Sequence, residues 1–568
     1  MQYTGARILI ECLIEQGVDT IFGYPGSAVL ALYDELYRQK KRIRHILVSH
    51  EQHAAHAADG YARSSGRAGV CLATSGPGAT NLVTGIAAAA IDSTPVVAIT
   101  GNVSVPLLGK DSFQEVDIAG VTMPVVKHNW IVKDIHELAE VIREAFLVAL
   151  SGRPGPVLVD IPKDIAAGSC EWDRSHAVSG AAKDRAIRLG ERDKRETFSN
   201  ADIEKAAALI AAAKRPVLYA GGGVILSGAH AELLQIAERL NAPVCLSLMG
   251  MGAFPYDHRL CTGLIGMHGT TASNKAVQKS DLLIAAGARF SDRVTSQVEK
   301  FARGAKILHI DIDPAEINKN IQSDASITGD LKIVLERLLH KLPEKMNTEW
   351  NGEIEAWKAL IPKEHHRKSS LHPRLVIQET AKALGLQAIT VTDVGQHQIW
   401  TAQFFPFKRP RSFISSGGMG SMGFGMGAAI GAKIANPDRP VVLFTGDGCF
   451  RMNSAEMATM VFYKLPVLII IFNNHTLGMV RQWQNYFYGS RYSQTDLEGR
   501  GPDFIKLAAA YNVPAYCAYD EASFLDSLEK CLAHNAAGGP ALIEAIIDKD
   551  EKVLPLVPSG KAIDEQIM

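Results

Sequence analysis

Two short motifs late in the chain combine residue types that suit a metal ion and a diphosphate group. The first is Gly446-Asp447-Gly448, and 24 residues further on the chain reads Asn473-Asn474. Both follow aliphatic runs, so we expect Asp447 and Asn474 at the carboxyl ends of neighbouring strands, where open α/β sheets bind ligands. A carboxylate, an amide oxygen and the backbone carbonyl of Thr476 suit Mg²⁺ and leave positions for diphosphate oxygens and water. The motifs therefore predict a magnesium site at Asp447, Asn474 and Thr476.

The same two motifs have a simpler interpretation. Asp-Gly commonly forms a tight turn and Asn-Asn commonly ends a loop, so either motif alone would predict only a change of chain direction. The spacing between the motifs and the expected strand before each of them favour the metal site.

Three stretches of the chain alternate β-branched runs with segments of helical spacing, which is clearest at 4–15 and 78–91. Expected strands lie at 70–74 and 96–99, then at 216–220, 282–286 and 307–312, and finally at 388–392, 441–445 and 467–472. This alternation predicts parallel sheets covered by helices on both faces. We expect an α/β fold with three doubly wound parallel-sheet domains at 1–165, 190–345 and 370–550, followed by a C-terminal tail at 551–568.

The first and third of these domains share a short similarity. Residues 95–101 read PVVAITG and residues 440–446 read PVVLFTG, and each follows a Ser/Gly-rich turn and an Ala/Gly-rich helix. Two buried parallel strands can acquire such similar compositions by chance. The shared order of turn, helix and strand favours a duplication that relates the two domains.

The amino-acid composition argues against nucleic-acid and membrane partners. The 59 Lys and Arg residues balance 60 Asp and Glu residues, so no excess charge draws the chain to nucleic acid or to an acidic membrane. The eight cysteines form no CxxC pair, which predicts reduced, buried thiols. The apolar runs are shorter than the roughly 20 residues that a membrane span needs. We expect a cytoplasmic protein that acts on small molecules and has no nucleic-acid or membrane partner.

The magnesium motif resembles that of the thiamine diphosphate enzymes, in which GDG is followed some two dozen residues later by NN. In the first domain, Glu51 follows an expected strand at 46–48 and is similar to the glutamate that hydrogen-bonds N1′ of the aminopyrimidine in this family. A carboxyl group there can share a proton with N1′ and promote the imino form of the 4′-amino group, which then accepts the proton from thiazolium C2. Alone, Glu51 would be interpreted as an acid in the first turn of a helix.

Further residues of the third domain resemble cofactor contacts of the same family. Gly395, Gln396 and His397 are similar to its diphosphate-binding turn. Gly420 and Met422 resemble the pair that accepts from the 4′-amino group and wedges the cofactor into a V shape, which brings the amino nitrogen next to C2. The Gly/Met-rich loop alone would predict flexible packing. The resemblance adds three further cofactor contacts, at Gly446, Gly448 and Met479.

Segments along the whole chain resemble one branch of this family, the catalytic subunits of acetohydroxyacid synthases, also called acetolactate synthases. Most specific are residues 478–484, which read GMVRQWQ, and residues 289–293, which read RFSDR and are similar to the flavin motif RFDDR. Ser291 replaces one acid of that motif, and a solvated pair of arginines is the simpler interpretation. The resemblance implies a Rossmann-like middle domain that binds FAD through Arg153, Gly222, Met267, His268, Arg289 and Glu316.

This resemblance implies a carboligation in branched-chain amino-acid biosynthesis. Pyruvate is decarboxylated and joined to a second 2-oxo acid, pyruvate or 2-oxobutanoate, which gives 2-acetolactate or 2-aceto-2-hydroxybutyrate. Arg293 would bind the second carboxylate and Trp483 the larger alkyl group. The implied catalytic residues are Glu51, Phe113, Gln114, Lys163, Arg293 and Trp483. The family also implies a homodimer or homotetramer with a small regulatory subunit, and a flavin-dependent pyruvate oxidase is the alternative function.

Overall fold

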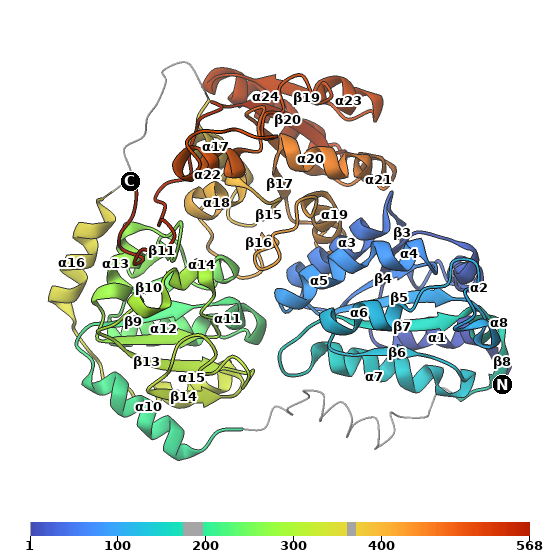
Figure 1. The fold of residues 1–568 in the computed structure, drawn as a ribbon, viewed down its shortest axis with the longest axis horizontal. Helices are drawn as coiled ribbons and strands as arrows, with labels where there is room; N and C mark the ends of the chain where they lie inside the picture. Colours follow the sequence, from blue (N-terminus) through green and yellow to red (C-terminus); the bar gives the residue numbers. More distant parts are fainter. Residues whose placement is uncertain (1, 174–196, 361–370) are drawn as a thin grey trace.

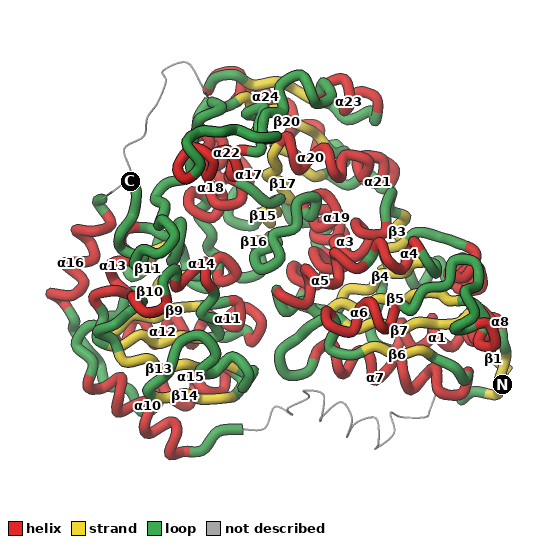
Figure 2. The backbone as a smooth tube through the Cα atoms, in the orientation of Figure 1, coloured by secondary structure: helices red, strands yellow, loops and turns green. Residues whose placement is uncertain are grey.

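Three six-stranded parallel sheets form the body of the molecule in the computed structural model, which describes residues 2–173, 197–360 and 371–568. Figure 1 shows the first domain in blue and cyan, the middle domain in green and yellow, and the third domain in orange and red. Helices cover both faces of the sheets (Figure 2). The predicted α/β fold class is thus confirmed.

The first domain has the strand order β3-β2-β4-β5-β7-β6. Its strands are β2 (Thr20–Gly23), β3 (Arg44–Leu47), β4 (Gly69–Ala73), β5 (Val96–Asn102), β6 (Asn129–Ile131) and β7 (Val157–Pro162). Its helices are α1 (Gly5–Glu15), α2 (Leu30–Arg38), α3 (Glu51–Ser65), α4 (Pro77–Asn81), α5 (Val83–Ile91), α6 (Ile118–Thr122), α7 (Leu138–Leu150) and α8 (Lys163–Ala167). A separate antiparallel pair joins β1 (Gln2–Thr4) to β8 (Ser169–Glu171).

The third domain has the strand order β16-β15-β17-β18-β20-β19. Its strands are β15 (Ile389–Thr392), β16 (Phe413–Ile414), β17 (Val441–Gly446), β18 (Val467–Asn473), β19 (Ala515–Ala518) and β20 (Ala541–Ile546). Its helices are α17 (Pro373–Leu384), α18 (Gln396–Phe404), α19 (Gly425–Ala435), α20 (Asp447–Asn453), α21 (Met457–Phe462), α22 (Gly478–Phe487), α23 (Phe504–Ala510) and α24 (Glu521–Ala536).

The first and third sheets have the same topology when their strands are numbered in chain order. The sequence similarity of residues 95–101 to 440–446, however, aligns β5 with β17. These two strands are not equivalent in the topology, because β5 is the fourth strand of its sheet in chain order and β17 is the third. The counterpart of β17 is β4, and the counterpart of β5 is β18. Buried parallel strands share an aliphatic composition, so a short local match does not identify equivalent strands. The equivalence of the two domains lies in their topology.

The middle domain has the strand order β11-β10-β9-β12-β13-β14, which is the Rossmann order. Its strands are β9 (Pro216–Ala220), β10 (Val244–Leu246), β11 (Cys261–Leu264), β12 (Leu282–Ala286), β13 (Lys306–Asp311) and β14 (Ala325–Thr328). Its helices are α10 (Asn200–Ala212), α11 (Gly222–Ser227), α12 (His230–Leu240), α13 (Thr271–Lys279), α14 (Asp292–Thr295), α15 (Leu331–Leu339) and α16 (Thr348–Lys358).

The C-terminal tail leaves the third domain and packs on the middle domain, where Figure 1 places the C-terminus beside α13 and α16. Ile563 is fully buried in a core that also contains Trp350 of α16. The amide of Asn274 on α13 donates to the Ile563 carbonyl oxygen at 2.7 Å. The packed middle domain therefore includes residues on both sides of the third domain in sequence.

Helices α3 and α19 join the first and third domains through direct backbone contact. A Cβ atom added at Gly431 would overlap the carbonyl oxygen of Ala57, and one at Gly60 would overlap that of Ala428. Alanines of both helices lie in one hydrophobic core together with strands of both sheets. The equivalent topology makes α3 and α19 counterparts, so the two domains meet through the same element.

All eight cysteines are free, and seven of them are buried, as predicted, while Cys517 is partly exposed. Among the described residues, no helix combines the length and apolar character required to span a bilayer.

The α3–α19 contact predicts opposite effects of two glycine-to-alanine changes. Gly431→Ala should lower the free energy of unfolding by about 1–3 kcal/mol, since the added methyl group has only backbone to displace. Gly352→Ala on α16 should raise it by about 0.5–1 kcal/mol, because no atom lies within 4 Å of the new Cβ. Urea unfolding measures both changes. Equal midpoints for the two variants would contradict the contact.

Candidate active site

The metal motif lies in a small pocket at the carboxyl ends of neighbouring strands in the third domain. Strands β17 and β18 pair in parallel, and Asp447 and Asn474 directly follow them. The pocket has a volume of about 60 Å³. Its lining contains most of the expected diphosphate and metal contacts, namely Gly395, Gln396, His397, Met422, Gly446, Asp447, Gly448, Asn474, Thr476 and Met479.

The polar groups of this pocket fit a cation and phosphate oxygens. Burial raises the pKa of Asp447 to about 7, so a cation beside it would favour the ionised carboxylate. The ring Nε2 of His397 is buried without a hydrogen-bond partner, and burial lowers its pKa to about 3, which keeps the ring neutral. The described residues contain no cluster of three His, Cys, Asp or Glu side chains placed to hold a metal. The expected ligand set has one carboxylate, so it is not such a cluster.

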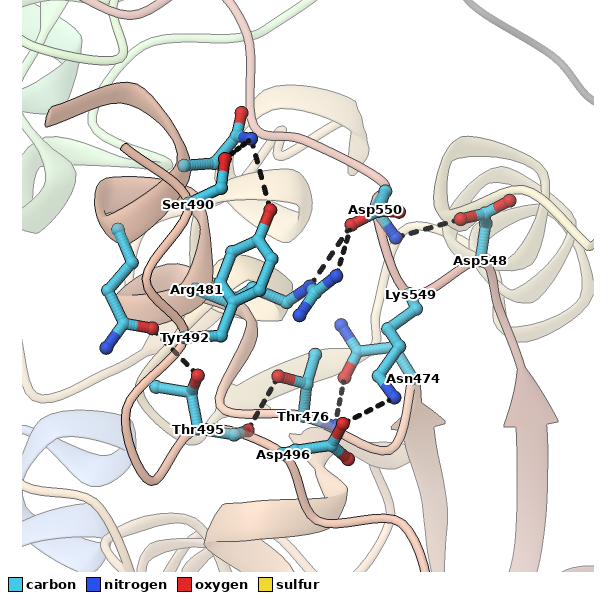
Figure 3. A network of polar contacts seen from close by, with 12 residues as sticks. Asn474, Thr476, Arg481, Ser490, Tyr492, Thr495, Asp496, Asp548, Lys549 and Asp550 are labelled. Atoms are coloured by element: carbon cyan, nitrogen blue, oxygen red, sulfur yellow. Dashed lines mark hydrogen bonds and ion pairs between the residues drawn. The ribbon is translucent and has the colours of Figure 1, made fainter. Parts of the chain in front are cut away.

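Hydrogen bonds fix the loop that carries Asn474 and Thr476 (Figure 3). The Asn474 side-chain oxygen accepts from the Thr476 backbone N–H at 3.3 Å, and the Asn474 amide donates to Gln396 at 3.2 Å. The Thr476 hydroxyl donates to the Thr495 carbonyl oxygen at 2.7 Å. The backbone of Asp496 forms an isolated antiparallel β-bridge with that of Thr476. The Asp496 side chain forms a 2.9 Å ion pair with Lys549. Asn474 is thus held by Gln396 and by its own loop, and Thr476 is held by the later segment at Thr495 and Asp496.

Residues 416–425, termed the glycine loop, carry Gly420 and Met422. The buried carboxylate of Asp393 accepts hydrogen bonds from the backbone N–H groups of Gly423 at 2.9 Å and Gly425 at 3.1 Å. Burial raises the pKa of Asp393, and these hydrogen bonds oppose the increase. Asp393 was not among the residues predicted for the site. Its position directly after a predicted strand was the available signal.

A second cavity of about 1190 Å³ lies between the three domains and also borders the metal pocket at Gly395 and Met479. It brings together all six residues expected to bind FAD, namely Arg153, Gly222, Met267, His268, Arg289 and Glu316. Gly420, Arg293 and Trp483 also line it. The cavity therefore unites the expected flavin contacts with part of the expected substrate site.

The geometry of this cavity fits a dinucleotide. The turn from β9 into α11 is so close to Gly287 that a Cβ atom at Gly221 or Gly223 would collide with its backbone. Such a glycine turn at a helix N-terminus, on a Rossmann sheet, suits a pyrophosphate. Arg153 reaches from the first domain to pair with Glu316 at 2.8 Å. Burial lowers the pKa of His268 to about 4, which keeps it neutral.

Four expected catalytic residues, Glu51, Phe113, Gln114 and Lys163, line neither cavity. Glu51 begins α3, and its carboxylate accepts from the Asn81 amide at 3.0 Å. Phe113 is 87 % exposed. A single chain therefore does not bring Glu51 into the pocket of Asp447.

Two carboxylates that sequence reasoning did not assign hold these residues in place. Fully buried Glu456 accepts from the Ser49 backbone N–H and from His53 Nδ1, both at 2.8 Å, on either side of Glu51. Glu115 accepts from the backbone N–H groups of Gly109, Lys110 and Ser112. It thereby fixes the loop that exposes Phe113. Apart from His53 Nδ1, these donors are backbone groups, so the sequence carried no signal for either role.

Comparison with known proteins agrees with this geometry. The sequence matches the thiamine pyrophosphate enzyme N-terminal TPP binding domain at 3–121, the central domain at 203–338 and the C-terminal TPP binding domain at 393–545. It is 48 % identical over 566 residues to the "Probable acetolactate synthase large subunit" of Methanocaldococcus jannaschii, a match that covers 98 % of this chain and 94 % of that protein. The chain belongs to the acetolactate synthase family.

Two further relatives show the same full-length match. The "Acetolactate synthase" of Mycobacterium bovis is 47 % identical, with 99 % of this chain and 91 % of that protein covered. The "Acetolactate synthase large subunit" of Corynebacterium glutamicum is 46 % identical, with 98 % and 89 % covered. The resemblance to acetolactate synthases is thus confirmed, and the two terminal domains are thiamine diphosphate-binding domains.

The role of Glu115 can be tested without activity. Glu115→Ala should make trypsin cleave after Lys110 roughly tenfold faster, because the loss of three hydrogen bonds from backbone N–H groups releases the loop. Asp111→Asn on the same loop is the matched control and should cleave as the wild type does. Mass spectrometry of the fragments gives the rates. Equal rates for both variants would show that Glu115 does not hold the loop.

Proposed function

We propose that the chain is the catalytic subunit of an acetolactate synthase that requires thiamine diphosphate, Mg²⁺ and FAD. The activity follows from membership of the family. The observation that supports the detailed assignment is that the pocket of Asp447 borders the cavity lined by Trp483 and Arg293. A cofactor held in the pocket would there face a substrate held in the cavity.

The third domain would hold the thiamine cofactor. Asp447, Asn474 and the Thr476 carbonyl would hold Mg²⁺, and His397 Nε2 would donate to the diphosphate. Gly420 and Met422 would position the aminopyrimidine. When bound, thiamine diphosphate supplies the electron sink for decarboxylation. The carboxyl group of Glu51 would hold a proton for N1′ of the aminopyrimidine.

The cavity would select the second substrate. The side chain of Arg293 is 66 % exposed, and its Nε lies 3.8 Å from the Asp292 carboxylate. Its guanidinium could therefore offer two parallel donors to a 2-oxo acid carboxylate. Trp483 provides an apolar surface for the ethyl group of 2-oxobutanoate. Phe113, Gln114 and Lys163 would complete the substrate site from a second copy of the chain.

The middle domain would hold FAD through the six residues of the cavity. Ser291, which stands where the family motif has an acid, lies at the cavity wall and is the N-cap residue directly before α14. It still caps the helix through its backbone, because its carbonyl oxygen accepts from the Thr295 N–H at 2.9 Å. We infer that the substitution leaves the shape of this wall intact.

We propose a homodimer with two shared sites as the smallest active unit. Glu51 lines neither cavity of its own chain, whereas its proposed role requires contact with a cofactor bound at Asp447. Large apolar side chains on the first domain are exposed, among them Leu30, Tyr37, Phe113 and Met123. A second copy would cover such side chains and supply Glu51. Relatives named "large subunit" support an additional small regulatory subunit.

The decisive assay supplies pyruvate to the protein with all three cofactors. We expect acetolactate and carbon dioxide without oxygen consumption, and Glu51→Gln should lower turnover at least about a hundredfold while thiamine diphosphate still binds. Glu137→Gln, at an exposed position of the first domain, is the control. Oxygen consumption coupled to pyruvate would favour a pyruvate oxidase. Near-normal turnover of Glu51→Gln would remove Glu51 from catalysis.

Shared sites make a distinct prediction about mixed subunits. Glu51→Gln and Asp447→Ala chains are each expected to be inactive. After subunit exchange at equal amounts, hybrid dimers contain one intact site, which should restore about a quarter of wild-type activity. Native mass spectrometry verifies the exchange. No recovery despite verified hybrids would contradict sites that combine residues of two chains.

A further inference from the structure

The glycine loop is held at both ends by buried carboxylates, and the one at its start comes from the first domain. Asp92 lies at the C-terminal end of α5, and its side chain has no exposed surface. It accepts from the backbone N–H of Gly417 at 2.9 Å and of Gly418 at 2.8 Å. Asp393 holds the other end through Gly423 and Gly425. Gly420 and Met422 lie between these two attachments.

A buried guanidinium orients the carboxylate of Asp92. Arg63 on α3 lies 3.1 Å from the Asp92 carboxylate, and it also pairs with fully buried Asp59. The same guanidinium donates to the Ser415 carbonyl oxygen at 2.8 Å, directly before the glycine loop. Burial of Asp92 costs desolvation energy, which the guanidinium and two backbone N–H donors offset. The position of the loop start is therefore set by charge-assisted hydrogen bonds from the first domain.

The neighbour of Asp92 connects this arrangement to the large cavity. Ser93 accepts from Arg153 Nε at 2.8 Å, and Arg153 in turn pairs with Glu316 of the middle domain. Asp92, Ser93, Arg153 and Glu316 all line the cavity. A continuous polar path thus runs from the proposed flavin contacts, through the first domain, to the loop proposed to hold the aminopyrimidine.

We propose that Asp92 is a positioning residue, which sets the distance of Gly420 and Met422 from the aminopyrimidine by holding the backbone N–H groups of Gly417 and Gly418. This inference rests on the proposed function and deepens it. A displacement of the loop start moves the backbone carbonyl of Gly420 away from the 4′-amino group, and a 1 Å displacement of such a group is enough to slow a reaction strongly. Asp92 itself contacts no reacting atom.

Two variants test the attachment from its two sides. Asp92→Asn keeps the size of the side chain but replaces one carboxylate oxygen, a hydrogen-bond acceptor, with an NH₂ group. This group cannot accept from the backbone N–H of Gly417 or Gly418. Gly418→Ala changes no charge, and its methyl group would lie 2.9 Å from Asp92 Oδ1, so the loop must move. Asp19→Asn is the matched control, because Asp19 pairs with Arg67 in a half-exposed ion pair of the same domain.

The first measurement uses the cofactor-free protein. Amide hydrogen exchange of peptides that cover residues 415–425 should be at least tenfold faster in Asp92→Asn and Gly418→Ala than in the wild type. The second measurement is hydrogen–deuterium exchange at C2 of thiamine diphosphate bound with saturating Mg²⁺. Both variants should exchange at least tenfold more slowly, while their flavin content and that of Asp19→Asn remain at the wild-type level.

The outcomes separate the two proposals. Wild-type C2 exchange in Gly418→Ala, with the loop demonstrably loosened, would overturn the positioning role of Asp92, and this holds whether or not Asp92→Asn folds. Slowed C2 exchange in Asp19→Asn to the same extent would also overturn it. A wild-type protein that binds no thiamine diphosphate would instead contradict the proposed function.

Discussion

The close contact of α3 and α19 is the constraint on which the arrangement of the first and third domains depends. Hydrophobic burial alone would hold two helices 8–10 Å apart, but here glycines let the backbones touch. Helix α3 begins at Glu51, and α19 begins at Gly425, the last residue of the glycine loop. One contact therefore determines where the proposed activating acid and the proposed wedge of the same chain lie. In the proposed dimer the two residues would serve different pockets, so the contact would also set the relation between the two sites.

Much of the fold was predictable because its signals are local. Strands β9 and β12 have the bounds that their β-branched runs predict, and Asp447 follows a strand as the GDG motif predicts. Buried parallel strands are continuous aliphatic runs, so their existence is easily read from sequence. Their equivalence is not, and this is why β5 was matched with β17. The packing of Ile563 into the middle domain was equally invisible, since the apolar residues of the tail follow neither helical nor strand periodicity.

The candidate site was predictable in its ligands but not in their supports. Residues such as Asp447 and Arg289 belong to motifs whose chemistry is recognisable. Asp393, Glu456, Glu115 and Asp92 act on backbone N–H groups, which every residue except proline carries. Because almost any residue can be the donor, no residue pattern identifies such an acceptor, and only Asp393 had a signal, its position directly after a predicted strand. The four carboxylates also have a common role. Each holds a backbone segment next to a residue proposed to act in the site.

The path of the tail has a consequence for how the chain folds during synthesis. Ile563 belongs to the core of the middle domain, yet the ribosome synthesises the whole third domain after α15 and before Ile563. At a translation rate of about 5–20 residues per second, this delay is roughly 10–40 s. The core of the first domain is also completed late, because it includes residues of α19 in the third domain. We therefore expect the three domains to complete their cores together and late, with apolar surface accessible to chaperones until then.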